Sequence, residues 1–221
     1  MSDRERSFLL ENTFYQLQFK LYDNDWLFTS LQGFFRNVLS GGSTLCFEAM
    51  HTDQFKSTFP NINVKDFYNY NIIKAYLGLI KRDLERLHKQ SALYDKRKTL
   101  SHAYRGYVFA REIFEGRKLR LRVDEYDEAI QKNFATIRDM NREWAEGDDE
   151  VADFIYAKAM EMREGATQEM QAGTLSRYMD PVKQRDLDNY LFDFQRSQAA
   201  RITGELDLQV VREVLEFGVK Y

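Results

Sequence analysis

The sequence has little cysteine, proline or histidine. Its single cysteine, Cys46, cannot form a disulfide within the chain, and no second cysteine supplies a cysteine-based zinc site. The three histidines lie far apart along the chain, which argues against a histidine-rich metal centre. Two prolines and 11 glycines in 221 residues leave few breaks, so the composition favours helices over a β architecture with many turns.

Long hydrophobic runs are also absent. No stretch approaches the roughly 18 uninterrupted apolar residues of a membrane-spanning helix, and the charged start, Met1–Arg6, is not followed by an apolar run of signal-peptide length. Hydrophobic residues make up 43% and aromatic residues 14%, while 32 basic and 35 acidic residues nearly balance, which excludes a disordered charged tail. We therefore expect a soluble protein of the cytoplasm without a membrane partner.

One strand and a series of helices are predicted from hydrophobic periodicity. Alternating apolar and polar residues from Tyr15 to Leu21 indicate a half-buried strand, and helical spacing from Leu27 to Leu39 ends where Gly41 can adopt a left-handed cap. The helical patterns that follow are 45–50, 64–88, 100–114, 124–147, 148–170, 181–200 and 206–217. The predicted fold class is mainly α, a helical bundle with one N-terminal strand or small β element.

Two aspartates mark predicted helix starts. Asp124 precedes a helical pattern and is expected to be its N-cap. Asp180 before Pro181 combines a capping side chain with a proline at the first helical position. Both helices would therefore begin directly after an acidic residue.

Charge is distributed unevenly along the chain. Residues 81–122 carry 13 basic and 5 acidic side chains, a net charge of +8, whereas residues 124–170 carry 5 basic and 14 acidic side chains, a net charge of −9. Either the two segments pair with each other inside the protein, or the basic one faces an anion such as a nucleotide phosphate or nucleic acid. The sequence leaves both interpretations open.

Lys98, His102 and Arg105 form the most organised polar set. Their spacing places them at about 0°, 40° and 340° around a helix, so the three side chains project from one side. Two cations and an imidazole at this spacing suit a phosphate or a carboxylate, with the histidine donating a hydrogen bond or moving a proton. The alternative is a solvated helix face.

Arg97 and His102 form an Arg-x4-His pattern in the same segment. Helical ribonucleases of the HEPN class use an arginine and a histidine at this kind of spacing, usually across a dimer, and the segment resembles them in this respect. That resemblance implies metal-independent RNA cleavage that depends on His102.

Asp23 and Asp25 end the strand-like segment and are candidate metal ligands. Two-metal phosphoryl transfer needs carboxylates at strand ends to hold Mg²⁺ between substrate oxygens. Such a site normally gathers more carboxylates than one Asp-x-Asp supplies, so a polar turn is the alternative. The sequence contains no Gly-x-x-x-x-Gly-Lys-Ser/Thr, Gly-x-Gly-x-x-Gly or His-Glu-x-x-His motif.

Two segments share an order of features with a known family. The first is the run from Leu27 to Gly42, followed by Leu45 and Glu48. The second is Lys98-x3-His102-x2-Arg105, followed by Glu112–Gly116. Together they resemble the predicted nucleotidyltransferases of the DNA polymerase β superfamily found in phages and bacteria. The first is similar to the helix, turn and Glu-bearing short helix after the last catalytic strand, and the second to the family's helical Lys–His–Arg signature.

The resemblance implies roles for these residues and a division of the chain. Asp25, or else Asp23, would match the third catalytic and metal-binding carboxylate, and the set of Lys98, His102 and Arg105 would face the nucleotide or the nucleic-acid acceptor. Residues 1–42 would end a nucleotidyltransferase palm, residues 43–123 would form a basic helical core, and residues 124–221 an acidic helical extension.

The sequence also departs from this family. Gly42 and Ser43 stand where the family has Asn-Pro, and its upstream Gly-Ser motif and Asp-x-Asp pair, which bind the triphosphate and two metals, have no counterpart before Tyr15. We therefore expect a component that binds a nucleotide or RNA and is inactive alone, or is completed by a separately encoded catalytic half, with Mg²⁺ only in the completed site. If phage-encoded, it would act in the host cytoplasm. The alternative is an all-helical protein-binding or regulatory protein, for example a homo-oligomer, without enzymatic activity.

Overall fold

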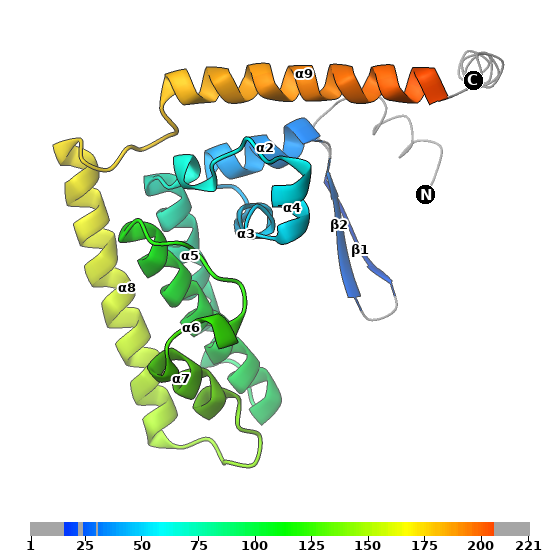
Figure 1. The fold of residues 1–221 in the computed structure, drawn as a ribbon. Helices are drawn as coiled ribbons and strands as arrows, with labels where there is room; N and C mark the ends of the chain where they lie inside the picture. Colours follow the sequence, from blue (N-terminus) through cyan, green and yellow to red (C-terminus); the bar gives the residue numbers. More distant parts are fainter. Residues whose placement is uncertain (1–15, 22–23, 30, 206–221) are drawn as a thin grey trace. The chain divides into compact units, whose positions relative to one another are not determined.

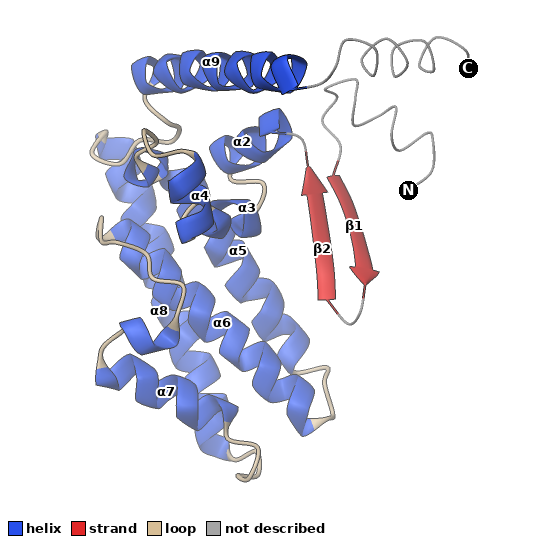
Figure 2. Ribbon diagram, turned by 45° about the vertical axis from the view of Figure 1, so that its right-hand side comes forward, coloured by secondary structure: helices blue, strands red, loops and turns tan. Residues whose placement is uncertain are grey.

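The computed structural model describes residues 16–21, 24–29 and 31–205, with side chains described for residue 31 and residues 33–197. In this part of the chain two strands are followed by eight α-helices and two short 3₁₀ helices (Figures 1 and 2). The predicted mainly-α fold class is therefore confirmed. The chain divides into two compact units, Met1–Met179 and Asp180–Tyr221. None of the described helices combines the length and the apolar character needed to cross a membrane.

The two strands form an antiparallel hairpin. β1 (Gln16–Leu21) pairs with β2 (Asn24–Thr29), with Gln16 opposite Thr29 and Leu21 opposite Asn24. β1 lies within the segment predicted as a strand. β2 occupies residues that the sequence assigned to a turn and to the first turn of the following helix, so that helix begins only after the hairpin.

Three short helices follow the hairpin: α2 (Leu31–Ser40), α3 (Thr44–Ala49) and α4 (Asp53–Thr58). α2 ends at Gly41, whose φ of 68° is the left-handed conformation expected from the sequence. A Cβ at this position would lie 2.6 Å from the backbone oxygen of Asn71, so glycine is also required by the close approach to α5. The Ser43 side chain caps α3 by accepting a hydrogen bond from the Cys46 N–H.

The core of the first unit is an antiparallel pair of long helices, α5 (Tyr70–Leu87) and α6 (Leu93–Phe114), which lie side by side in both ribbon views (Figures 1 and 2). Asn69 caps α5 by accepting from the Ile72 N–H, after the 3₁₀ helix η1 (Val64–Phe67). The two helices approach closely at Gly106, where a Cβ would lie 3.1 Å from the side chain of Ile80. Their apolar faces are fully buried along this contact.

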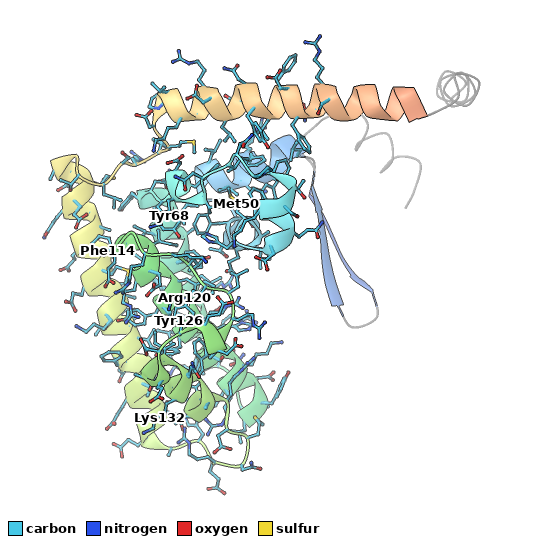
Figure 3. The ribbon with its side chains drawn as sticks, in the orientation of Figure 1. Met50, Tyr68, Phe114, Arg120, Tyr126 and Lys132 are labelled. Atoms are coloured by element: carbon cyan, nitrogen blue, oxygen red, sulfur yellow. The ribbon has the colours of Figure 1, made fainter. Side chains whose placement is uncertain are left out.

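The segment after α6 crosses back over the core before two further helices begin. Its backbone is held by tyrosine hydroxyls, because Tyr68 accepts from the Leu119 N–H and Tyr126 donates to the Arg120 oxygen. Figure 3 shows Arg120 and Tyr126 beside one another on this segment, which contains the 3₁₀ helix η2 (Val123–Glu125).

α7 (Glu128–Arg138) and α8 (Glu146–Ala172) complete the first unit, and α8 packs against both α5 and α6. Asp127, rather than Asp124, caps α7 by accepting from the Ile130 N–H. The predicted helix from 124 to 147 is therefore interrupted, and residues 139–145 form a loop. α6 belongs to the predicted basic core and α8 to the predicted acidic extension, so these two segments pack together within one unit.

α9 (Pro181–Glu205) is the described part of the second unit. It begins where the sequence predicts, because Asp180 accepts hydrogen bonds from the backbone N–H groups of Val182 and Lys183 ahead of a first-turn proline. The predicted helix at 206–217 lies outside the described residues.

Candidate functional site

An open cavity of about 500 Å³ lies where α5 and α6 meet the turn between α2 and α3. Its walls are the backbone and side chains of Gly41–Leu45, the carboxylate of Glu48, and polar side chains from the two long helices. On α5 the small residues Ala75 and Gly78 face the cavity, and a Cβ added to Gly78 would meet no atom within 4 Å. The small side chains therefore leave room for a ligand, and the longer polar side chains determine which chemical groups the cavity can bind. The polar side chains from the helices are Arg82, Asp83, His102 and Arg105.

Glu48 is the carboxylate that α3 contributes to the cavity, with a side chain 14% exposed. Tyr76 donates a hydrogen bond to its Oε1 at 3.2 Å, and Nη2 of Arg105 lies 3.5 Å from its Oε2. Burial raises the pKa of Glu48, and the charge of Arg105 and the hydrogen bond from Tyr76 oppose this shift only in part. Glu48 is therefore a carboxylate that accepts a proton more readily than an exposed one.

Arg105 joins Glu48 to the aromatic core. Its side chain is 42% exposed, and its guanidinium lies over the ring of Phe109 at 5.6 Å from the ring centre. The guanidinium thus contacts the ring while part of the side chain remains exposed. A planar guanidinium in this position suits a phosphoryl or carboxylate oxygen.

His102 lies one helical turn before Arg105 on the same side of α6. Burial lowers its pKa from the ordinary value, and the charge of Arg105 lowers it further, while Asp83 opposes this and Lys98 and Arg138 add to it. The imidazole is therefore neutral at pH 7 and offers one donor and one acceptor. The balance of these charges at His102 is positive, which favours an anion nearby.

Asp83 and Arg82 form the second ion pair of the cavity. Nε and Nη2 of Arg82 both donate to Oδ1 of Asp83 at 3.2 Å. The carboxylate is 5% exposed, whereas the arginine is 60% exposed. Each of the two guanidinium groups that line the cavity already contacts a carboxylate that is at most 14% exposed, so an incoming anion competes with an internal one.

The structure brings two of the three predicted helical residues to one site. His102 and Arg105 line the cavity, whereas Lys98 is exposed one turn earlier and acts on the site through its charge at His102. Asp25 lies in β2 opposite Lys20, and its side chain is not described. Asp23 lies outside the described residues. Within the described part of the chain, no group of three or more His, Cys, Asp or Glu side chains is placed to hold a metal.

Arg82, Asp83 and Tyr76 are cavity or supporting residues that the sequence analysis did not single out. Asp83 had a detectable signal, because it falls within the buried stripe of α5 between Ile80 and Leu84. A carboxylate inside an apolar helix face requires a partner or a function. Glu48 was marked only through the family resemblance.

Arg97 has a structural role that separates it from His102. Its side chain is 2% exposed, and its guanidinium donates to the backbone oxygens of Ile137, Arg142 and Glu143. It therefore lies among α6, α7 and α8, and it is not one of the residues that line the cavity with His102. The two residues of the Arg-x4-His pattern do not share one surface.

No family model, curated protein or solved structure matches the chain.

Proposed function

We propose that the chain is a nucleotidyltransferase-related component whose cavity binds the phosphate groups of a nucleotide or of a nucleic-acid acceptor. One observation carries this proposal: the two segments that resemble those enzymes, far apart in the sequence, meet at the same cavity. Gly41–Gly42 and Glu48 come from the first segment, and His102 and Arg105 from the second. A chance likeness in either segment would not require them to meet.

The chemistry of the cavity supports a phosphate ligand. Arg105 offers partly exposed donors in a fixed fork, Arg82 offers a second exposed guanidinium, and the neutral His102 can donate one hydrogen bond. A volume of about 500 Å³ falls within the range of small-molecule sites. Ligand phosphate would be contacted mainly by α6, and the glycine turn would allow close approach of the backbone.

We further propose that nucleotidyl transfer requires a separately encoded catalytic half. In this proposal, the family's Gly-Ser motif and Asp-x-Asp pair would come from that partner. The carboxylates of that pair would hold Mg²⁺ in the completed site, where the ion would supply electrostatic stabilisation of the transferred phosphoryl group. The present chain would contribute binding and positioning.

Direct titration tests the binding proposal. Isothermal titration calorimetry with ATP, with pyrophosphate and with a short 5′-phosphorylated RNA would be compared for the wild type, Arg105→Gln and the control Arg163→Gln, which removes an exposed arginine of α8 outside the cavity. We expect Arg105→Gln to weaken binding about 10- to 100-fold, the effect of losing a charged hydrogen bond, and Arg163→Gln to leave it unchanged. Absence of binding to all three ligands, or equal effects of the two variants, would overturn the proposal.

A transfer assay tests the second half of the proposal. The chain alone, supplied with Mg²⁺, labelled ATP and an RNA acceptor, is expected to show no transfer. Turnover by the purified chain would show that no partner is needed.

A second candidate function, protein binding without catalysis, is favoured by exposed aromatic side chains on α8. Phe154 and Tyr156 are 53% and 46% exposed, and Phe154 borders a second, more apolar cavity of about 470 Å³ among α6, α7 and α8. Single exposed aromatics are normal, but exposed apolar surface that continues into an apolar cavity, as at Phe154, is typical of an interaction site. This second function would be the better supported one if none of the phosphate ligands binds.

A further inference from the structure

We infer that Glu48 is an intramolecular competitor for the phosphate ligand, so that phosphate binding at Arg105 is accompanied by proton uptake at Glu48. The inference rests on the proposed phosphate site and adds to it a residue that sets its affinity. Its basis is geometric: the carboxylate of Glu48 contacts the guanidinium that a phosphate would use, and both side chains line the same cavity.

The competition follows from the contacts of Arg105. Its Nη2 lies 3.5 Å from Oε2 of Glu48, and its guanidinium carbon lies over the ring of Phe109. A phosphoryl group that accepts from this guanidinium brings negative charge next to a carboxylate that is only 14% exposed. Because both the phosphoryl group and the Glu48 carboxylate would then contact the same guanidinium, their negative charges would lie close together and repel each other strongly. One of them must be neutralised or withdrawn.

Protonation neutralises Glu48 without moving its side chain and without breaking its hydrogen bond to Tyr76. The hydroxyl of Tyr76 donates to Oε1, and it can continue to donate to the carbonyl oxygen of a protonated Glu48. The Tyr76 side chain is fully buried, and burial raises its pKa well above 10, so this hydroxyl keeps its own proton. Burial raises the pKa of Glu48 as well, which lowers the free-energy cost of adding the proton.

The titratable and charged groups around Glu48 come from two helices. Tyr76 of α5 and Arg105 of α6 contact it, and Arg82 and Asp83 of α5 and His102 of α6 line the same cavity. Asp83 accepts hydrogen bonds from Nε and Nη2 of Arg82 and is 5% exposed, so its negative charge is balanced by Arg82 independently of Glu48. His102 is the other group that could take up a proton beside an anion, and a variant must therefore separate it from Glu48.

The test compares Glu48→Gln with the wild type over a range of pH. Glutamine keeps an oxygen to accept from Tyr76 and removes the charge, so the fold is expected to persist. The control is Glu85→Gln, an exposed carboxylate of α5 that pairs with Lys81 outside the cavity. Pyrophosphate is the probe, and ATP and 5′-phosphorylated RNA are added to find which source of phosphate the site prefers.

The ratio of wild-type to Glu48→Gln dissociation constants cancels the ligand's own titration. As the pH falls through the raised pKa of Glu48, the wild-type carboxylate becomes protonated and the ratio should approach unity. By about pH 8 the wild type should bind about tenfold more weakly than Glu48→Gln, the equivalent of one pKa unit of coupling. Calorimetry in buffers of different ionisation enthalpy should show proton uptake by the wild type and by His102→Gln, and much less by Glu48→Gln.

The possible outcomes separate the two proposals. If the wild type binds none of the phosphates, the proposed function fails. If it binds them with an Arg105 dependence, but Glu48→Gln binds no more tightly at high pH or takes up as many protons, only the competitor role is refuted. Should Glu48→Gln fail to fold, Tyr76→Phe provides the same test. Loss of the Tyr76 donor makes Glu48 easier to protonate, so this variant should bind pyrophosphate near pH 8 more tightly than the wild type, by a smaller factor than expected for Glu48→Gln. Unchanged binding would refute the inference.

Discussion

The guanidinium of Arg97 lies 3.5 Å from the carboxylate of Asp148, and each side chain is only 2% exposed. The contact joins the basic segment of the chain to the acidic one, within the core of the first unit. Asp148 is also bound by Arg142 and by the backbone N–H of Ala145. A buried pair with this many partners fixes the loop between α7 and α8 on α6. Other basic side chains pair outside the acidic segment, as Arg105 does with Glu48, so internal pairing between the two segments accounts for only part of the charge pattern. That the basic segment faces a phosphate stays a prediction.

Removal of the Arg97 charge is therefore expected to destabilise the fold. Arg97→Met keeps much of the volume but removes the donor to three backbone oxygens and one of the cations that face Asp148, and it should lower the free energy of unfolding by about 3–5 kcal/mol. Urea unfolding followed by circular dichroism measures the loss. Arg86→Met, an exposed position of α5, is the control and should change stability by less than about 0.5 kcal/mol. Equal effects would contradict the role assigned to Arg97.

His51 should make stability depend on pH. The imidazole is 8% exposed between Phe47 and Tyr68, and burial, with the charges of Lys56 and Lys118, lowers its pKa from 6.5 to about 4. The folded-state pKa thus lies below the unfolded one. As pH falls from about 6.5 to 4 the unfolded chain takes up a proton that the folded protein does not, so stability is lost in this window, by roughly 3 kcal/mol in total.

Urea midpoints between pH 7 and pH 4 measure this dependence. His51→Gln should flatten the curve, whereas His88→Gln, at an exposed position, should leave it as in the wild type. A wild-type curve parallel to that of His51→Gln would show that the acid sensitivity arises elsewhere.

The pKa of His102 should respond to the charged residues around the cavity. Its pKa is lowered by burial and then by Arg105, so Arg105→Gln should raise the pKa toward the ordinary value, and Asp83→Asn should lower it further. Titration of the imidazole ring protons by NMR gives the values directly. The sign of the two shifts is the test, because a His102 distant from both groups would respond to neither.

Gly41 should be less replaceable than another left-handed glycine. Gly41 and Gly116 have φ values of 68° and 65°, but only Gly41 would place a Cβ against backbone, 2.6 Å from the Asn71 oxygen. Gly116→Ala should cost about 1 kcal/mol, from its conformation alone. Gly41→Ala should cost clearly more and should also weaken phosphate binding, because it displaces the turn that forms one wall of the cavity. Similar costs for the two variants would contradict this explanation.

Much of the helical framework could be predicted from the sequence, because the signals were local. The glycine at the end of α2 and the Asp180–Pro181 start of α9 specify their structures through backbone conformation and capping. The apolar periodicity of α5 likewise corresponds to its buried face.

The failures arose where tertiary contacts decide the structure. The helix predicted over 124–147 ends at Arg138, because the loop after it gives its carbonyl oxygens to Arg97 instead of to an α-helical ladder. Nothing local in residues 139–145 indicates an arginine 45 residues earlier in the chain. The placement of the Arg82–Asp83 pair beside His102 likewise requires the packing of α5 on α6, which spacing along one helix does not reveal.

The close approach of α5 and α6 at Gly106 makes the dimensions of the cavity depend on a residue that does not line it. Gly106 follows Arg105 on α6 and contacts Ile80, two residues before Arg82 on α5. A larger side chain at position 106 would push α5 and α6 apart and increase the distance between Arg82 and Arg105, while the residues that line the cavity stay the same. Selection can therefore adjust the spacing of the cavity's cations, and with it the size of the anion that fits, through the core.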